Sequence, residues 1–229
     1  MKRVVITINR QYGSGGKTIG YMLAEKLGIP CYSREILQRA SEESGINESM
    51  FNARDERLKR LPKFLLSTNV YSGELLPPES KEFTSDQNLF NYEAEIIKKY
   101  AAEGSCVLIG RCADFVLKDD PDMISVYVHA DHDFQMKSAL ERVSMSEKEM
   151  EKYIERTNKY RSDFYHYHTG RSWDDAENYD LCLNVSKLGT AGTIAMIEQY
   201  IRHCEEDKAV SYLFQVTAGL ESMVLGEDQ

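Results

Sequence analysis

The chain has 229 residues and a formal net charge of −9 at pH 7, with 42% hydrophobic and 28% charged residues. These values fit a soluble globular protein that forms one α/β domain with a subdomain, or two small domains. The negative charge argues against general binding to nucleic acid or anionic membranes, although a local basic pocket for phosphate groups stays compatible with it. No apolar run approaches the ~20 residues that cross a bilayer, and the N-terminus lacks the ~7–15-residue apolar core of a signal peptide.

The cysteines are scattered along the chain, odd in number and without a CxxC motif: Cys31, Cys106, Cys112, Cys182 and Cys204. Disulfide frameworks and zinc sites use closely spaced cysteines, so this pattern predicts buried, reduced thiols in a cytoplasmic protein.

Strand and helix signals alternate through the first half of the chain. They predict a buried strand over 4–8, a helix over 17–27 that Gly28 caps, a short strand over 29–32, and helices over 34–44 and 48–60. The stretch 67–87 shows no periodicity and is too long for a simple connection, so we expect a mobile flap there.

The second half continues the alternation. It predicts a helix over 86–103, a buried strand over 106–110, a short helix over 111–117 and a strand over 123–130. The capping box of Ser146 and Glu149 predicts the start of a helix that runs toward Arg161. A strand over 180–185 and a last helix follow, and this helix has Ile194, Ile197, Ile201 and Cys204 on one face. Strands that alternate with helices imply an α/β protein whose parallel sheet is covered on both faces.

The first strand leads into the segment INRQYGSGGKTIG, residues 8–20. A phosphate-binding loop needs a strand, glycines that let backbone N–H groups converge on an anion, and a helix that starts there. In this interpretation Lys17 reaches the β- and γ-phosphates, the Thr18 hydroxyl binds Mg²⁺, and the whole ATP-binding set is Gly13, Ser14, Gly15, Gly16, Lys17 and Thr18. The pattern G-x-x-x-x-G-K-[ST] would require glycine where the chain has Gln11, a loss that is tolerable if Gln11 adopts the needed backbone angles. The alternative is a glycine-rich turn.

Several motifs follow in the order found in the cytidylate kinase-like family of P-loop proteins, relatives of the nucleoside monophosphate kinases. The opening INRQYGSGGKTIGYMLAEKLGIPCYSREIL, the segment Ile109-Gly110-Arg111, a YVHAD strand and the late Tyr179-Asp180-Leu181 resemble this family over residues 1–205. The resemblance implies a three-layer P-loop kinase fold with a central parallel sheet. It divides the chain into a kinase-like domain over 1–205 (core 1–32 and 101–205, helical acceptor-binding flap 33–100, arginine-bearing lid about 152–172) and a tail over 206–229.

The resemblance also implies roles for basic residues. Segment 152–171 has five basic and two acidic residues, a balance of +3 that suits a lid over polyphosphate; the alternative is a solvated helix face. Arg156 and Arg161 are the expected catalytic arginines, together with Lys17. Arg111 is expected to contact the acceptor phosphate through its planar fork, and the alternative for Arg111 is an ion pair at a helix terminus.

Departures from the family leave the acceptor open. Where cytidylate kinase has an Asp-Ser pair that helps to read cytosine, this chain offers Ser33 and Arg34 as acceptor-binding residues. The usual GRD is GRC, with Cys112 in place of the acid, and the Asp-x-x-Arg of the lid begins with Asn158. The loss of three acids weakens the case for CMP itself, while ATP binding is still expected.

Histidines occur in two further patterns. HADHD, residues 129–133, is expected to be a strand end followed by a helix N-cap rather than a metal site, because no Cys or third His lies at a recognisable ligand spacing. His166 and His168 alternate with tyrosines in the lid segment, which predicts base stacking or packing of the lid.

The tail SYLFQVTAGLESMVLGEDQ, residues 211–229, is too apolar for a solvated terminus. It resembles the HLFRVAxGLDSMVLGExQ stretch of glutamyl-tRNA reductase, with Tyr212 in place of histidine. The catalytic cysteine region of that enzyme is absent, so reductase activity is not expected. A gene fusion, a truncated longer protein and a helix used for docking stay open as its origin.

The sequence predicts ATP-dependent phosphoryl transfer, with ATP and Mg²⁺, to a cytidylate-like nucleoside monophosphate or a related small acceptor. The alternative is a nucleotide-binding regulatory module without small-molecule kinase activity, linked through the tail to tetrapyrrole biosynthesis. We expect small-molecule nucleotides as partners, no nucleic acid and no membrane; a homo-oligomer stays open.

Overall fold

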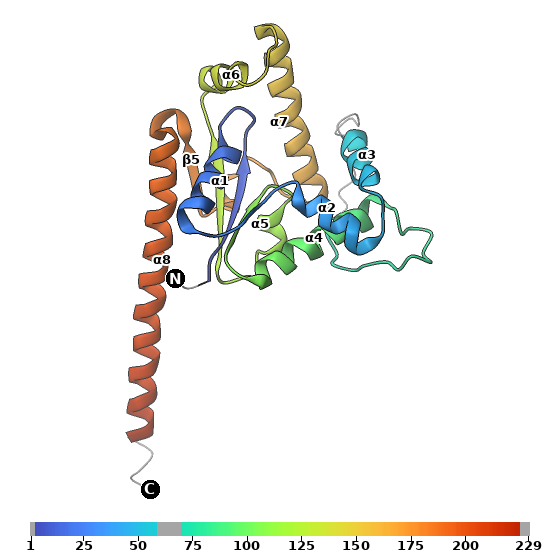
Figure 1. Ribbon diagram of the computed structural model, residues 1–229. Helices are drawn as coiled ribbons and strands as arrows, with labels where there is room; N and C mark the ends of the chain where they lie inside the picture. Colours follow the sequence, from blue (N-terminus) through green and yellow to red (C-terminus); the bar gives the residue numbers. More distant parts are fainter. Residues whose placement is uncertain (1–2, 59–69, 225–229) are drawn as a thin grey trace.

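The computed structural model describes residues 3–58 and 70–224, without the side chains of 56–58 and 207–224 (Figure 1). Within these residues a five-stranded parallel sheet has the order β2-β3-β1-β4-β5. Its strands are β1 (Val5–Arg10), β2 (Cys31–Tyr32), β3 (Cys106–Ile109), β4 (Met123–His129) and β5 (Leu181–Asn184). Because β1 lies between β3 and β4, the loop after β1 leaves the sheet where the strand order reverses, the usual place for a ligand in such sheets.

The connections between strands are helical. The helices are α1 (Gly16–Leu27), α2 (Glu35–Ser44), α3 (Glu48–Leu58), α4 (Asp86–Glu103), α5 (Ala113–Val116), α6 (His132–Leu140), α7 (Glu147–Thr169), the short 3₁₀ helix η2 (Ala176–Asn178) and α8 (Val185–Val224), which breaks at Gly189. No helix in the described part of the chain is long and apolar enough to cross a membrane.

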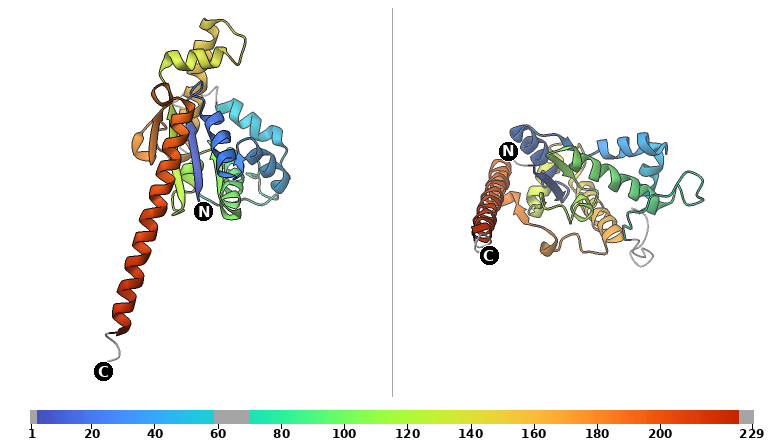
Figure 2. Two further views of the ribbon diagram at one scale, coloured as in Figure 1. Left: turned by 60° about the vertical axis from the view of Figure 1, so that its left-hand side comes forward. Right: turned by 90° about the horizontal axis from the view of Figure 1, so that it is seen from below.

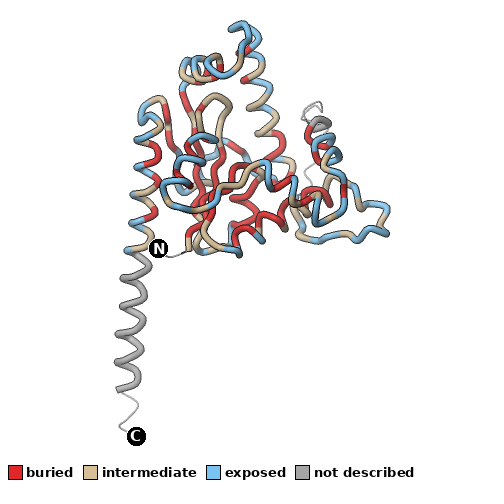
Figure 3. The backbone as a smooth tube through the Cα atoms, viewed as in Figure 1, coloured by how far each residue is buried: buried red, intermediate tan, exposed pale blue. Residues whose placement is uncertain are grey.

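Side chains alternate between the two faces of the sheet, and on each face they pack against a layer of helices. Ile6 and Ile8 of β1 point to one face, where they pack with residues of α1 and α8. Val5 points to the other face, where α4 and α5 cover the sheet and α2, α3 and α7 complete the core. Figure 2 shows the sheet between these layers, and Figure 3 shows that buried residues are concentrated in the strands and in the helices that face them. This three-layer arrangement is the fold that the alternation of strands and helices predicts.

The elements agree with the sequence-based expectations in type, with differences at their ends. Helix α4 has the bounds that were expected, and the expected strands over 106–110, 123–130 and 180–185 are each slightly shorter. Helix α7 runs past Arg161 to Thr169, because Phe164, Tyr165 and His168 continue its apolar spacing and become buried. Helix α6 follows the N-cap expected at HADHD, but its extent was not predicted: among its residues only Gln135 and Ala139 are buried, so its apolar pattern is weak.

The segment expected to be a flap is described only from residue 70 onward. Residues 70–85 contain no helix or strand, and side chains of α4 hold their backbone. Asn88 Oδ1 accepts from the Leu76 N–H at 2.8 Å, and Asn88 Nδ2 donates to the Phe83 carbonyl at 2.7 Å. The mobility of this segment stays a prediction, and residues 59–69 lie outside the described residues.

The cysteines are free thiols, as predicted, but burial holds for Cys106 and Cys112 alone. Cys31 and Cys204 are half-buried, and Cys182 is exposed at the edge strand β5. The expectation of five buried thiols was therefore wrong for three of them, because the spacing of cysteines carries no information about which strand forms the edge of the sheet. The tail over 211–229 lies outside the residues whose side chains are described.

Candidate functional site

The glycine loop joins the end of β1 to the start of α1. Gly13 and Gly15 both have φ of 79°, a left-handed conformation that favours glycine. A Cβ on Gly13 would lie 2.6 Å from the carbonyl oxygen of Gln135, so the close approach of α6 also requires glycine there. Gly15 is the N-cap of the 12-residue α1, and the first N–H groups of this helix lack intrahelical partners. The loop has the geometry of an anion site at a helix N-terminus.

Gln11 stands where the phosphate-loop pattern has glycine, and its side chain ties the loop to neighbouring elements. Its backbone is outside the left-handed region, so glycine is not needed there for conformation. Its Oε1 accepts from Gln135 Nε2 at 2.9 Å and from the Ala130 N–H at 3.2 Å. Ser14 Oγ donates to the Gln11 carbonyl at 2.8 Å. A glycine could not make these side-chain contacts, so Gln11 anchors the loop where the usual glycine would leave it flexible.

Lys17 and Thr18 lie exposed on the first turn of α1. The Lys17 ammonium is 5.6 Å from the centroid of the Tyr21 ring and pairs with no carboxylate among the residues that the structure describes. The Thr18 hydroxyl accepts a long hydrogen bond, 3.4 Å, from Arg142 Nη2. Both side chains are therefore accessible to a ligand bound at the loop.

Helix α7 contacts the loop through two side chains. Asn158 Oδ1 accepts from the Tyr12 N–H at 2.7 Å, and Arg161 Nη1 donates to the Arg10 carbonyl at 2.7 Å. The Arg161 guanidinium also lies 5.9 Å from the centroid of the Tyr12 ring. The expected lid segment is thus part of a helix that rests against the glycine loop.

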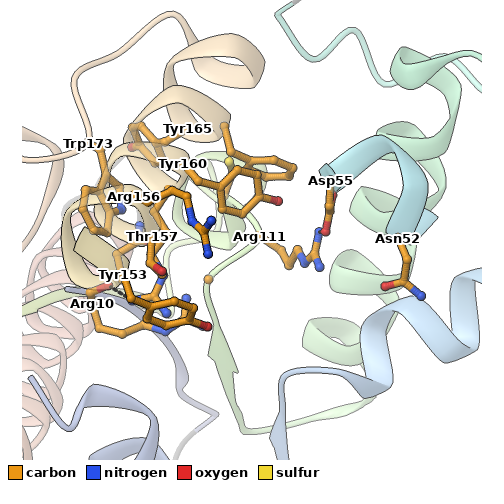
Figure 4. Close-up of a pocket in the computed structure, with 15 residues that line it drawn as sticks. Arg10, Asn52, Asp55, Arg111, Tyr153, Arg156, Thr157, Tyr160, Tyr165 and Trp173 are labelled. Atoms are coloured by element: carbon orange, nitrogen blue, oxygen red, sulfur yellow. Dashed lines mark hydrogen bonds and ion pairs between the residues drawn. The ribbon is translucent and has the colours of Figure 1, made fainter. Parts of the chain in front are cut away.

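A cavity of about 680 Å³ lies beside the loop, between α3 and α7 (Figure 4). Its described lining includes four arginines and a single acidic residue, Asp55. Asn9, Asn52, Tyr160 and Trp173 add polar and aromatic surface. The lining is strongly cationic in a chain of negative net charge, so the cavity suits an anionic ligand.

Arg111 reaches this cavity from a strained turn after β3. Gly110, Arg111 and Cys112 have φ of 74°, 58° and 54°, and left-handed backbone at two successive residues with side chains is uncommon. Arg111 Nη1 lies 2.7 Å from Asp55 Oδ2. Burial lowers the pKa of Arg111, but the carboxylates of Asp55 and Glu93 together hold it above its usual value. The expected cavity position and an ion pair therefore coexist at Arg111, and the pair joins it to Asp55 in the last described turn of α3.

The ion pair of Arg111 continues into a buried cluster. Arg54 Nη2 donates to Asp55 Oδ1 at 2.9 Å and to Glu93 Oε1 at 2.6 Å, and both Arg54 and Glu93 are fully buried. Burial alone would raise the pKa of Asp55, but Arg111 and Arg54 together hold it below its usual value. The cluster fixes α3 on α4 and presents the Asp55 carboxylate to the cavity.

A second buried acid orients two lining residues. Asp114 accepts from Asn9 Nδ2 at 2.9 Å and from the Tyr165 hydroxyl at 2.7 Å. Burial raises the pKa of Asp114, and these two hydrogen bonds oppose that shift. Cys112, which replaces the acid of the usual GRD motif, is buried beside it, so an acid two residues later is available for positioning.

The structure brings together most of the predicted site residues. Arg111, Arg156 and Arg161 line the cavity, and Lys17 and Thr18 lie on the first turn of α1, directly after the glycine loop. Ser33 and Arg34 are not among the described residues that line it: the Arg34 side chain is 81% exposed and pairs with Glu48 at 3.4 Å, and the Ser33 N–H donates to Glu35.

Sequence reasoning missed Arg10, Asn52 and Asp55. Arg10 had a signal, since it directly follows the buried run of β1 and so lies at the carboxyl end of a central strand. Asn52 and Asp55 had none, because a charged helix becomes a cavity wall only through tertiary packing.

The histidines of the two sequence patterns lie in different environments. Asp131, not a histidine, is the N-cap of α6, as the strand-end interpretation of HADHD expects. His166 is exposed, whereas His168 is fully buried and stacks on Phe90 with ring centroids 3.8 Å apart. His168 therefore packs α7 onto α4.

His168 should make the stability of the fold depend on pH. Burial, followed by the nearby charges of Arg54 and Arg111, holds the pKa of His168 well below its usual 6.5. The unfolded chain then takes up a proton at His168 that the folded chain does not, so stability is retained above the unfolded pKa and falls as the pH drops below it. From about pH 7.5 to about pH 5.5 the loss is about 1.4 kcal/mol, measured by urea unfolding.

The matched variants are His168→Phe, which keeps an aromatic ring on Phe90, and His132→Phe, whose native side chain is 59% exposed. The first variant should lose this part of the pH dependence and the second should keep it. Equal pH dependence in both variants would contradict the assignment.

The parallel sheet, the glycine loop and the basic cavity define a P-loop kinase-like protein. The model of the cytidylate kinase-like family matches residues 5–187, and the chain belongs to this family, as the sequence motifs predict. An uncharacterized protein from Eubacterium ventriosum of known structure is 26% identical, with a TM-score of 0.65 over 87% of this chain and 99% of that chain. Shikimate kinase from Bacteroides thetaiotaomicron is 13% identical, with a TM-score of 0.51 over 87% of this chain and 98% of that chain, and shares the fold. None of the curated proteins matches this chain.

Proposed function

We propose that this protein transfers the γ-phosphoryl group of ATP to a small acceptor, either a cytidylate-like nucleoside monophosphate or a related molecule. The observation that supports this most is the junction of loop and cavity. Arg161 lines the cavity and donates to the carbonyl of Arg10, the residue that leads into the glycine loop. A donor at the loop and an acceptor in the cavity would meet at this junction, and such positioning is the main requirement of phosphoryl transfer.

The loop residues fit a nucleoside triphosphate. The left-handed glycines and the start of α1 supply backbone N–H donors, and Lys17 has no competing carboxylate among the described residues. The exposed Thr18 hydroxyl would hold Mg²⁺ in place of its long contact with Arg142. The ion would neutralise charge between the β- and γ-phosphates.

The remaining residues would align the acceptor and stabilise charge. An acceptor oxygen attacks the γ-phosphorus, and the bond from that phosphorus to the bridging oxygen breaks to release ADP. Lys17, Arg156 and Arg161 would stabilise the charge on the transferring group. Arg111 would orient the acceptor, with its guanidinium held by Asp55 at 2.7 Å.

Formation of ADP by the purified full chain tests this proposal. ATP and Mg²⁺ are supplied alone and then with CMP, dCMP, UMP or AMP. The expected result is ADP formation that rises above the rate with ATP alone when the right acceptor is present. If no acceptor raises the rate, and Lys17→Ala leaves the affinity for ATP unchanged, the proposal fails.

The contact between Asn158 and the Tyr12 N–H favours a second candidate function, a regulatory module that binds nucleotide without transferring phosphate. That contact occupies one backbone donor of the loop. Calorimetry with ATP alone, and then with ATP and each nucleoside monophosphate, separates the two. Tight ATP binding without acceptor synergy or turnover favours the module.

A further inference from the structure

Arg10 is a cation for which the described residues supply no anion. Its Nε is buried without a hydrogen-bond acceptor, and no carboxylate of the described chain lies within ion-pair distance. Burial lowers the pKa of Arg10 well below its usual value, and the neighbouring charges of Arg161 and Arg111 lower it further. Arg10 as a whole is half-buried, but a charge withdrawn from water without a partner is costly, so its presence needs a reason.

Two glycines make room for the Arg10 side chain. A Cβ on Gly16, the first residue of α1, would lie 2.5 Å from Arg10 Cβ. A Cβ on Gly110, in the turn before Arg111, would collide with Arg10 Nη1. The Arg10 side chain therefore extends from the glycine loop to the turn after β3 and lines the cavity along the way.

The described residues that line the cavity carry more positive than negative charge. Arg111 is paired with Asp55 at 2.7 Å and lies 3.7 Å from Glu93. Arg10, Arg156 and Arg161 have no carboxylate partner within the described ranges. Burial lowers the pKa of Arg161 to about 10. Figure 4 shows Arg10 and Arg156 on the α7 side of the cavity and Asp55 with Asn52 on the opposite side.

We propose that Arg10 is an anion-binding residue which, with Arg161, holds a phosphate or carboxylate group of the acceptor at the end of the cavity next to the glycine loop. The inference rests on the proposed function in calling this ligand an acceptor. The anion site itself does not depend on phosphoryl transfer. Its ligand class is a small anion-bearing molecule whose uncharged part extends toward Asn52 and Asp55.

The fluorescence of Trp173 provides a direct test. It is the only tryptophan of the chain and lines the cavity, so its emission reports occupancy of the cavity rather than of the loop. The full chain, without ATP, is titrated with inorganic phosphate, and separately with acetate as the carboxylate probe. Lys118→Ala, which removes a charge from an exposed lysine outside the residues that line the cavity, should leave the response unchanged.

Arg10→Met removes the charge and keeps an unbranched aliphatic stem. It should weaken the binding of the preferred anion at least ~10-fold, as expected for the loss of a charge-assisted contact, while Arg10→Lys should recover part of the affinity. The matched control is Arg202→Met, which removes the same charge from an exposed position of α8. The melting temperature Tm of the anion-free Arg10→Met protein should stay level or rise, because an unpaired, half-buried charge is gone.

The outcomes separate a binding role from a structural one. Equal affinities in Arg10→Met and Arg202→Met, no anion response in the unmodified chain, or a lower Tm of Arg10→Met with unchanged affinity would each overturn the inference. An Arg10-dependent anion response in a protein that forms no ADP with any acceptor would support the site while the proposed function fails. Which anion binds more tightly distinguishes a phosphate acceptor from a carboxylate acceptor.

Discussion

Replacing Lys17 by alanine should lower kcat/KM for ADP formation by about 10²–10³-fold, the usual cost of removing one donor that stabilises transition-state charge. Lys17 is exposed, and the described residues offer it no carboxylate, so its removal should leave the fold unchanged. The measurement is the acceptor-dependent rate of ADP formation together with calorimetric ATP affinity and Tm.

Lys118→Ala is the matched control for this prediction. Lys118 is an exposed lysine near the end of α5, outside the residues that line the cavity. Its removal should change neither kcat/KM nor Tm appreciably. Equal rates in the two variants would show that Lys17 does not contact the transferring phosphate, and the glycine loop would then lose its proposed role.

Replacing Arg54 by methionine should destabilise the fold by about 3–5 kcal/mol, the cost of breaking a buried ion pair from one side. The change leaves the buried carboxylate of Glu93 without its 2.6 Å partner, and Arg111 would be its nearest remaining cation at 3.7 Å. Urea unfolding with a fitted free energy of unfolding measures the effect. Because Asp55 also loses a partner, affinity for the anion probe should change as well.

Arg39→Met supplies the comparison on the surface. Arg39 pairs with Glu43 at 3.0 Å and with Glu103 at 2.7 Å, and its side chain is 29% exposed. Partly exposed pairs contribute little, so this variant should lose about 0–1 kcal/mol. Similar losses in the Arg54 and Arg39 variants would mean that the buried cluster is not what fixes α3 on α4.

The sequence identifies the parts of the site that are local in the chain. The glycine loop needs a strand, a few glycines and a helix start within a short segment, and all of these can be read from residues 4–27. The bounds of α4 were also predictable, since Ser85 caps its start through the Asn88 N–H and Gly104 ends it. Three of the four arginines that line the cavity, Arg111, Arg156 and Arg161, were predicted from the order of motifs in the family rather than from local patterns.

The parts that could not be predicted depend on contacts between distant segments. Arg54 meets Glu93 across 39 positions, and Asn9 meets Asp114 across 105. No local pattern marks such partners, because a charged residue in a helix is normally solvated. Arg34 is the reverse case: it follows the second strand in a suggestive position, yet α2 begins there and its side chain is exposed to solvent, so its role in acceptor binding stays a prediction.

Helix α7 links the glycine loop to the core of the protein. It spans 23 residues, about 34 Å at 1.5 Å per residue, and contains neither glycine nor proline, the usual places for a helix to bend. Its first part packs on α6 through Met150 and Ile154, and its last part stacks His168 on Phe90 of α4. We therefore expect the helix to move as a rigid body, with the backbone bending at Gly170, its C-cap. A motion that lifts Asn158 and Arg161 off the loop would also move His168 against Phe90, so the contacts of α7 with the glycine loop and its packing on α4 are coupled.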